Sequence, residues 1–184
     1  HNGTVYRWNR PCYGISEGRP HLRIECRALP AGPTVLDEVA NAVFWIGLIL
    51  GGRDEFGDIT ERLDFDDAKY NFLAASRHGL DAGFHWIDGR QVSAPDLICE
   101  TLLPLARAGL EGRVDRADID KYLGVVERRV EGRRTGSDWM ILSLNEMGDQ
   151  GTRSERMAAL TAAMACKQGQ HDPCHEWDLA RLEE

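Results

Sequence analysis

Apolar and polar positions alternate between residues 21 and 29, immediately before a proline-rich break. The apolar positions are Leu22, Ile24, Cys26 and Ala28. Because successive side chains of an extended chain point to opposite faces, this alternation predicts a β-strand with a core face and a charged face. A short aromatic and β-branched run predicts another strand at residues 5–8, and the glycine-containing residues 11–20 predict a loop between the two strands.

After residue 33 the apolar positions recur at helical spacing. Thr34, followed three residues later by Asp37, predicts the start of a helix, and the glycines at 51 and 52 predict its end near Leu50. Apolar residues cover most of the circumference of this segment. We therefore expect it to be the central helix of a core.

Five more helices are predicted by the same periodicity and by capping residues. Their predicted caps are Asp64, Ser93, Asp115, Ser137 and Thr152. The first of them ends at about His78, and the second reaches about Leu110 with a kink at Pro104. From Gln170 onward the sequence predicts irregular structure.

The sequence thus predicts a mainly α fold, with a β-rich head at residues 1–33 and a six-helix body at residues 34–184. Asp88 and Gly89, between two strand-like runs, predict a small hairpin within the body. Two or three short strands cannot bury themselves, so the head needs further strands from a missing N-terminal segment or a second protomer. We expect a homo-oligomer, and the start at His1 rather than at methionine favours a fragment of a longer protein.

The net charge of -8 at pH 7 limits the possible partners. Nucleic acids and anionic membranes are negatively charged and attract proteins that carry a positive field. We therefore expect neither as a partner of this acidic chain. We find no uncharged apolar run of about 18 residues, the length needed to cross a membrane. The 5 cysteines are irregularly spaced and form a poor disulfide framework, which favours a reducing, cytoplasmic location.

The charged face of the strand at residues 21–29 carries Arg23, Glu25 and Arg27. The Cβ atoms of Arg23 and Arg27 should each lie roughly 6 to 7 Å from the Cβ atom of Glu25, close enough for one ligand to reach all three side chains. A carboxylate between two guanidiniums suits a site for phosphate and carboxylate groups, in which the acid binds Mg²⁺ or Mn²⁺. The alternative is a row of weak surface ion pairs.

The segment from Arg23 to Thr34, together with Asn9-Arg10-Pro11 upstream, resembles the core motif of glutamate-cysteine ligase family 2. The catalytic domain of that family is similar to glutamine synthetase. Further segments resemble landmarks of the family in the same order: residues 77–82, Trp86 with residues 88–90, residues 135–137 with Trp139, and residues 175–177.

This resemblance implies the C-terminal part of a glutamine synthetase-like α+β fold, belonging to an ATP-dependent carboxylate-amine ligase. Such enzymes form a γ-glutamyl amide through an acyl phosphate, as in glutathione biosynthesis, from glutamate and cysteine or another amine. ATP and Mg²⁺ or Mn²⁺ are the implied cofactors. Glu25 is then the metal ligand, Arg27 the catalytic clamp on the substrate carboxylate or transferring phosphoryl group, and Arg10 and Arg23 bind ATP phosphates.

The resemblance also implies that these residues are inactive alone, because the N-terminal strands of such enzymes supply further metal ligands. A catalytically silent helical oligomerisation domain is the alternative function. An exposed strand in the head would itself drive self-association.

Three other groups of residues have both a chemical and a structural interpretation. A zinc site is one interpretation of Cys166, His171, Cys174 and His175. His78 and His85 are either catalytic or structural. An adenine platform and core packing are the two interpretations of Trp45, Trp86, Trp139 and Trp177.

Overall fold

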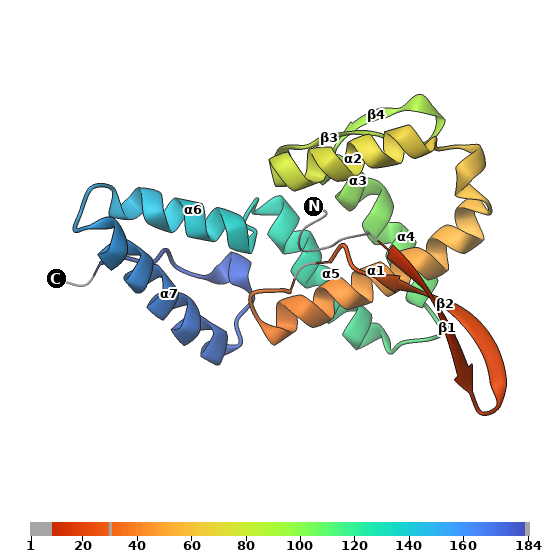
Figure 1. Cartoon of the computed structure of the whole chain (residues 1–184), viewed down its shortest axis with the longest axis horizontal. Helices are drawn as coiled ribbons and strands as arrows, with labels where there is room; N and C mark the ends of the chain where they lie inside the picture. The colour runs from red at the N-terminus through yellow and green to blue at the C-terminus, as the bar shows by residue number, and fades with distance from the viewer. Residues whose placement is uncertain (1–8, 30, 183–184) are drawn as a thin grey trace. The chain divides into compact units, whose positions relative to one another are not determined.

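The computed structural model describes residues 9–29 and 31–182 (Figure 1). Its internal contacts divide the chain into two compact units, His1–Ala31 and Gly32–Glu184. The strand predicted at residues 5–8 lies outside the described residues.

The described part of the first unit is an antiparallel hairpin of β1 (Asn9–Ser16) and β2 (Arg19–Cys26). Glu17 and Gly18 connect the strands with φ values of 51° and 75°. Left-handed values at both positions are typical of the two-residue turn that matches the twist of the strands. The loop predicted at residues 11–20 is therefore wrong over most of its length. Its two prolines, Pro11 and Pro20, are tolerated because both strands of a two-stranded sheet are edge strands.

The two faces of this hairpin differ as the alternation predicts. Residues opposite each other in the pair share a face, and the apolar face carries Tyr13, Ile15, Leu22 and Ile24. The prediction that this face is part of a core is wrong, because Leu22 is 80% exposed and Ile24 is 59% exposed. A two-stranded ribbon has no second layer of its own to cover an apolar face.

The second unit is built mainly from helices, and the predicted mainly α fold with short β segments is confirmed. Its α-helices are α1 (Val35–Phe56), α2 (Phe65–His78), α3 (Ala94–Leu97), α4 (Leu103–Leu110), α5 (Arg116–Glu131), α6 (Gly136–Met147) and α7 (Arg153–Gln170). Its strands are β3 (Gly83–His85) and β4 (Gln91–Ser93), and its 3-10 turns are η1 (Ile59–Glu61), η2 (Gly79–Asp81), η3 (Ile87–Gly89) and η5 (Cys174–Glu176). A π-helical turn, η4 (Ile98–Leu102), joins α3 to α4.

Two clusters form most of the core of this unit. In the first, α1, α4 and α5 pack side by side around residues such as Ala40, Ala106 and Leu123 (Figure 1). In the second, α6 and α7 pack with the C-terminal segment, residues 172–182, around Trp139, Leu160 and Trp177. Trp139 and Trp177 meet edge to face with ring centroids 5.1 Å apart, which supports core packing for these two tryptophans.

Helix α1 is longer than predicted. Its N-terminus is as expected, since the Thr34 hydroxyl accepts a hydrogen bond from the Asp37 amide. However, the helix continues through Gly51 to Phe56, so the glycine pair does not end it. A Cβ at Gly51 would collide with the carbonyl of Leu105 in α4. This glycine therefore allows two helix backbones to approach closely, a role that sequence alone does not distinguish from a helix end.

The other predicted helices and the small hairpin are largely confirmed. Asp88 and Gly89 make the β3–β4 turn with φ values of 58° and 73°. The helix begun by Ser93 runs to Leu110, and the π-helical turn precedes Pro104, whose ring cannot continue a regular helix. The cap predicted at Ser137 is wrong. Thr135 caps α6 instead, in a reciprocal capping box with Asp138.

A buried polar network joins the two ends of the second unit. Asp37 is fully buried, and its Oδ1 accepts a hydrogen bond from Nη2 of Arg129 in α5 at 2.7 Å. Its Oδ2 accepts from the Thr34 hydroxyl at 2.8 Å and from the Cys174 amide at 3.1 Å. Asn41 accepts from the other terminal nitrogen of Arg129. One carboxylate thus links α1, α5 and the C-terminal segment.

Length and composition alone would allow α1 to cross a membrane, and it is the single such helix among the described residues. The expectation that no segment crosses a membrane rests on the lack of an uncharged apolar run of about 18 residues, and α1 has Asp37 and Glu38 in its first turn. The core helix of a soluble protein passes the same test, and α1 packs against α4 and α5 in the core. The predicted absence of a membrane partner stays a prediction.

Candidate functional site

The charged face of the β1–β2 hairpin is the candidate site. The register places Arg10 opposite Glu25 and Cys12 opposite Arg23. Arg10 contacts Oε2 of Glu25 through Nε at 2.8 Å and through Nη2 at 2.7 Å. From the other side, Nε of Arg27 donates to Oε1 of Glu25 at 3.1 Å. Two guanidiniums therefore hold one carboxylate. Arg10 belongs to β1, and Arg27 directly follows β2.

This cluster is partly open to solvent. The Glu25 side chain is 40% exposed and the Arg27 side chain is 29% exposed. The hydrogen bond from Arg27 is the main cause that holds the pKa of Glu25 below its ordinary value. Burial opposes this shift, and the charge of Arg10 adds to it. Glu25 is therefore ionised at neutral pH, and each arginine has one carboxylate oxygen as a partner.

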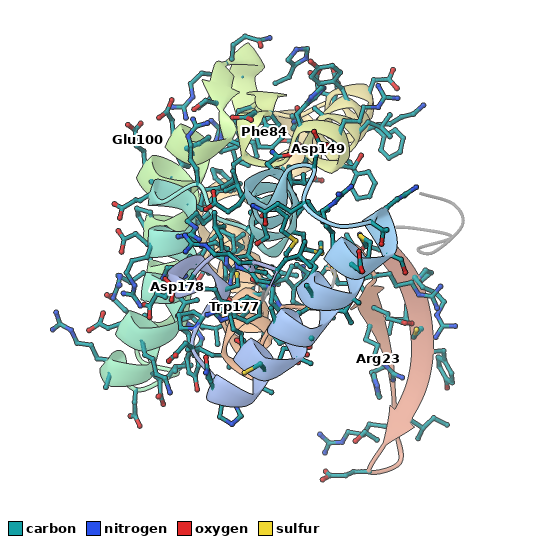
Figure 2. All side chains as sticks on the ribbon, turned by 90° about the vertical axis from the view of Figure 1, so that its left-hand side faces the viewer. Arg23, Phe84, Glu100, Asp149, Trp177 and Asp178 are labelled. Atoms are coloured by element: carbon teal, nitrogen blue, oxygen red, sulfur yellow. The ribbon has the colours of Figure 1, made fainter. Side chains whose placement is uncertain are left out.

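Arg23 is not part of this cluster, although the sequence analysis grouped it with Glu25 and Arg27. Its Nη1 lies 3.2 Å from Nε2 of His21, and because a guanidinium only donates, that ring nitrogen accepts. A Cβ at Gly14, opposite His21, would come within 2.8 Å of that ring nitrogen. The missing side chain at Gly14 thus leaves room for Arg23 to lie over β1 (Figure 2).

Sequence reasoning missed the partnership of Arg10 with Glu25, and it missed the roles of Gly14 and His21. The reason is that residues 11–20 were interpreted as a loop, so no register across the strands could be derived. The turn residues Glu17 and Gly18, followed by the strand at 21–29, were the available signal. A hairpin centred there places Arg10 directly opposite Glu25.

The arrangement fits an oxyanion better than a metal ion on its own. Arg10 and Arg27 present the planar donor groups that bind carboxylate and phosphate. Glu25 is one carboxylate already held by two positive charges, and Mg²⁺ needs several oxygen ligands. Among the residues that the structure describes, no group of three or more His, Cys, Asp or Glu side chains could hold a metal ion. A metal role for Glu25 needs ligands from outside these residues.

The zinc interpretation finds no support in the described part of the chain. Cys166 lies exposed on α7, whereas Cys174 is buried in η5, and they form no metal-binding group with His171 and His175. Burial raises the pKa of the Cys174 thiol to about 12, so it is not a thiolate at neutral pH.

His85 is held by several contacts from α2. Its Nδ1 lies 2.8 Å from Oδ1 of Asp67, and its ring stacks on Tyr70 with centroids 4.4 Å apart. The amide side chain of Asn71 bonds both the amide and the carbonyl of the His85 backbone. These contacts attach the β3–β4 hairpin to α2, which favours the structural interpretation of this histidine.

Comparison with protein-family models, with curated proteins and with solved structures found no match. The resemblance to glutamate-cysteine ligase family 2 therefore depends on the sequence motifs alone, and the geometry of the hairpin is independent of it.

Proposed function

We propose that this chain is the C-terminal portion of an ATP-dependent carboxylate-amine ligase of the glutamate-cysteine ligase type. The ordered motifs of the sequence support the proposal. The observation that carries it is the convergence of Arg10 and Arg27 on the carboxylate of Glu25. Among the contacts of the described residues, Arg27 bonds Glu25 through Nε alone, so its terminal nitrogens can donate to a substrate carboxylate or a phosphoryl group.

In the proposed reaction, ATP phosphorylates the γ-carboxylate of glutamate, and the amine of cysteine or of another acceptor displaces phosphate. Substrate, nucleotide and acyl phosphate are all anionic. Arg27 would hold the transferring group or the substrate carboxylate, and Arg10 and Arg23 would hold the phosphates of ATP. Such positioning and charge stabilisation supply most of the catalysis of phosphoryl transfer.

Mg²⁺ or Mn²⁺ bound with ATP would neutralise part of the triphosphate charge. Glu25 is proposed as one ligand, and a missing N-terminal segment or a second protomer would supply the others. The described residues by themselves do not form a complete metal site. A cytoplasmic location is part of the same proposal, because ATP-dependent synthesis of small thiols needs a reducing compartment.

The decisive experiment measures ATP-dependent γ-glutamyl amide formation in the protein extended by its upstream coding sequence. We expect turnover there and none from these 184 residues alone. Arg27→Gln should lower turnover by about a hundredfold or more, as loss of a transition-state charge partner does. Arg19→Gln, near the turn of the same hairpin, is the matched control and should retain activity. Ligation by the extended protein that survives Arg27→Gln and Glu25→Gln would contradict the proposal.

A non-catalytic oligomerisation domain is the second candidate function. The exposed apolar face with Tyr13, Ile15, Leu22 and Ile24 favours it, as do the unpaired edges of a two-stranded sheet. In this case the chain should form a dimer that binds no ATP in a calorimetric titration. Replacing both Leu22 and Ile24 by lysine should then yield monomers in size-exclusion chromatography with light scattering, without loss of helical circular dichroism.

A further inference from the structure

An apolar recess lies within the helical unit and is lined by residues other than those of the candidate site. It has a volume of about 410 Å³ and lies between the C-terminal part of α1, η1, the β3–β4 turn and the η4–α4 helix. Its walls include Phe56, Trp86, Leu102 and Leu105, with Phe56 and Trp86 meeting edge to face at 6.3 Å between centroids. A volume of this size suits a small molecule rather than a protein segment.

The charge of the residues that line this recess is positive. Arg53 is the one charged residue among those that line it. The Arg53 side chain is 84% exposed, and its nearest carboxylate oxygen, on Asp54, lies at 4.0 Å, beyond hydrogen-bond distance. Arg62 lies over the Phe56 ring, but Asp88 accepts two hydrogen bonds from it and balances its charge. The recess therefore offers one loosely held guanidinium to a single anionic group.

Gly52 gives an independent reason to regard this recess as a binding site. Glycine is the least favourable residue of a helix interior after proline. At Gly47 and Gly51 close packing against α4 requires it, whereas a Cβ at Gly52 would meet only the edge of Phe56, at 3.8 Å. Gly52 lines the recess, so a larger side chain at this position would enter it.

We propose that this recess binds a small molecule with an apolar, ring-sized body and one carboxylate group. The body would pack against the Phe56–Trp86 pair and Leu105 on the walls of the recess, and the carboxylate would pair with Arg53. The inference is independent of the proposed ligase function, because it uses neither the hairpin of the first unit nor ATP.

The test titrates the chain with 4-phenylbutanoate and with its neutral amide, by calorimetry and by ¹H–¹⁵N NMR. We expect the shifts to centre on the Gly52 and Gly57 amides and the Trp86 indole N–H, and the carboxylate to bind more tightly than the amide. Gly52→Leu should weaken binding by about tenfold or more, because a side chain of this size fills the recess. Arg53→Gln should remove the preference for the carboxylate.

Gly169→Leu is the matched control, since Gly169 lies on the exposed end of α7 with nothing within 4 Å of its Cβ position. It should leave the affinity unchanged. Neither leucine substitution places its Cβ in a clash, so a folded Gly52→Leu protein that binds as tightly as the parent would overturn the proposal. Absence of binding to the parent chain, or shifts that centre elsewhere, would also overturn it.

Discussion

Asp37 is the residue in which burial and charge conflict most strongly. Its carboxylate is fully buried and receives hydrogen bonds from Thr34, Arg129 and Cys174. A buried ion pair contributes little relative to apolar packing, but loss of one partner leaves the other charge without compensation. The stability of the second unit should therefore depend on the charge of this one side chain.

Asp37→Asn tests this dependence. It keeps the size of the side chain but leaves the Arg129 guanidinium buried without its counter-charge. We expect the free energy of unfolding in urea to fall by about 3 to 5 kcal/mol. Asp54→Asn is the control, because Asp54 is exposed and pairs with Arg53 only at 4.0 Å. A loss at Asp37 no larger than that at Asp54 would contradict the buried-charge argument.

His175 makes the stability depend on pH. Its side chain is 7% exposed, and neither ring nitrogen has a hydrogen-bond partner. Burial lowers its pKa below the ordinary 6.5, and the charges of Arg128 and Arg129 act in the same direction. The carboxylate of Glu176, whose Oε1 lies 3.5 Å from Nε2, opposes this shift without reversing it. The unfolded chain thus binds the proton more tightly, so stability is complete above pH 6.5 and falls as the pH drops towards the lower, folded-state pKa.

We expect His175→Phe to flatten the dependence of unfolding free energy on pH in the range below 6.5, the ordinary pKa of histidine. Urea titrations at several pH values measure it. His78→Gln, at the exposed end of α2, serves as the comparison and should keep the slope of the parent. If His175→Phe also keeps that slope, another group causes the dependence.

At the scale of elements, the close contact between α1 and α4 determines the packing of the larger core cluster. Gly47 and Gly51 on α1 face Ala106 and Gly109 on α4. A Cβ at Gly47 would lie 2.6 Å from the Ala106 carbonyl oxygen. The two backbones can approach this closely only because these positions lack larger side chains.

Alanine substitutions within α1 should therefore have opposite effects. Gly47→Ala should destabilise the protein by about 1 to 3 kcal/mol, since the helices must separate. Gly52→Ala should stabilise it by up to about 1 kcal/mol, because it gains helix propensity without a clash. Thermal unfolding of the two variants measures the difference. Equal shifts of Tm in both variants would show that the contact does not limit the packing.

At the scale of the whole molecule, the C-terminal segment holds the parts of the helical unit together. The Trp139 indole donates to the Asp178 carbonyl at 2.8 Å, and Arg134 donates to the Trp177 carbonyl at 2.6 Å. Trp177 and Asp178 lie next to each other on this segment (Figure 2). The Cys174 amide extends the connection to Asp37. The segment lacks regular helix, yet it completes the second core cluster.

Truncation after His171 tests this role. It would expose Trp139 and Met147, which are fully buried in the intact unit. We expect the amides of α6 to lose most of their protection in hydrogen exchange, whereas those of α4 and α5 retain more of theirs, since a separate cluster buries them. Uniform loss in all helices would mean that the two clusters unfold as one.

Local sequence signals predicted the elements well where a cap or turn is determined by its own residues. Thr34, Asp88-Gly89 and Thr152 are examples, because each makes hydrogen bonds or adopts dihedrals within its own turn. The end of α1 was missed because Gly51 has a tertiary partner. For the candidate site, the residue types Arg10, Glu25 and Arg27 were identified, but their pairing was not.

The sequence by itself determined the amphipathic helices, the alternating strand and the side chains of its charged face. These follow from backbone periodicity and from contacts a few residues apart. The tertiary structure alone decided that Arg10 rather than Arg23 holds Glu25, that Gly51 continues a helix, and that Asp37 meets Arg129 and Cys174. Each of these depends on distances between segments far apart in the chain, and no local pattern encodes such distances.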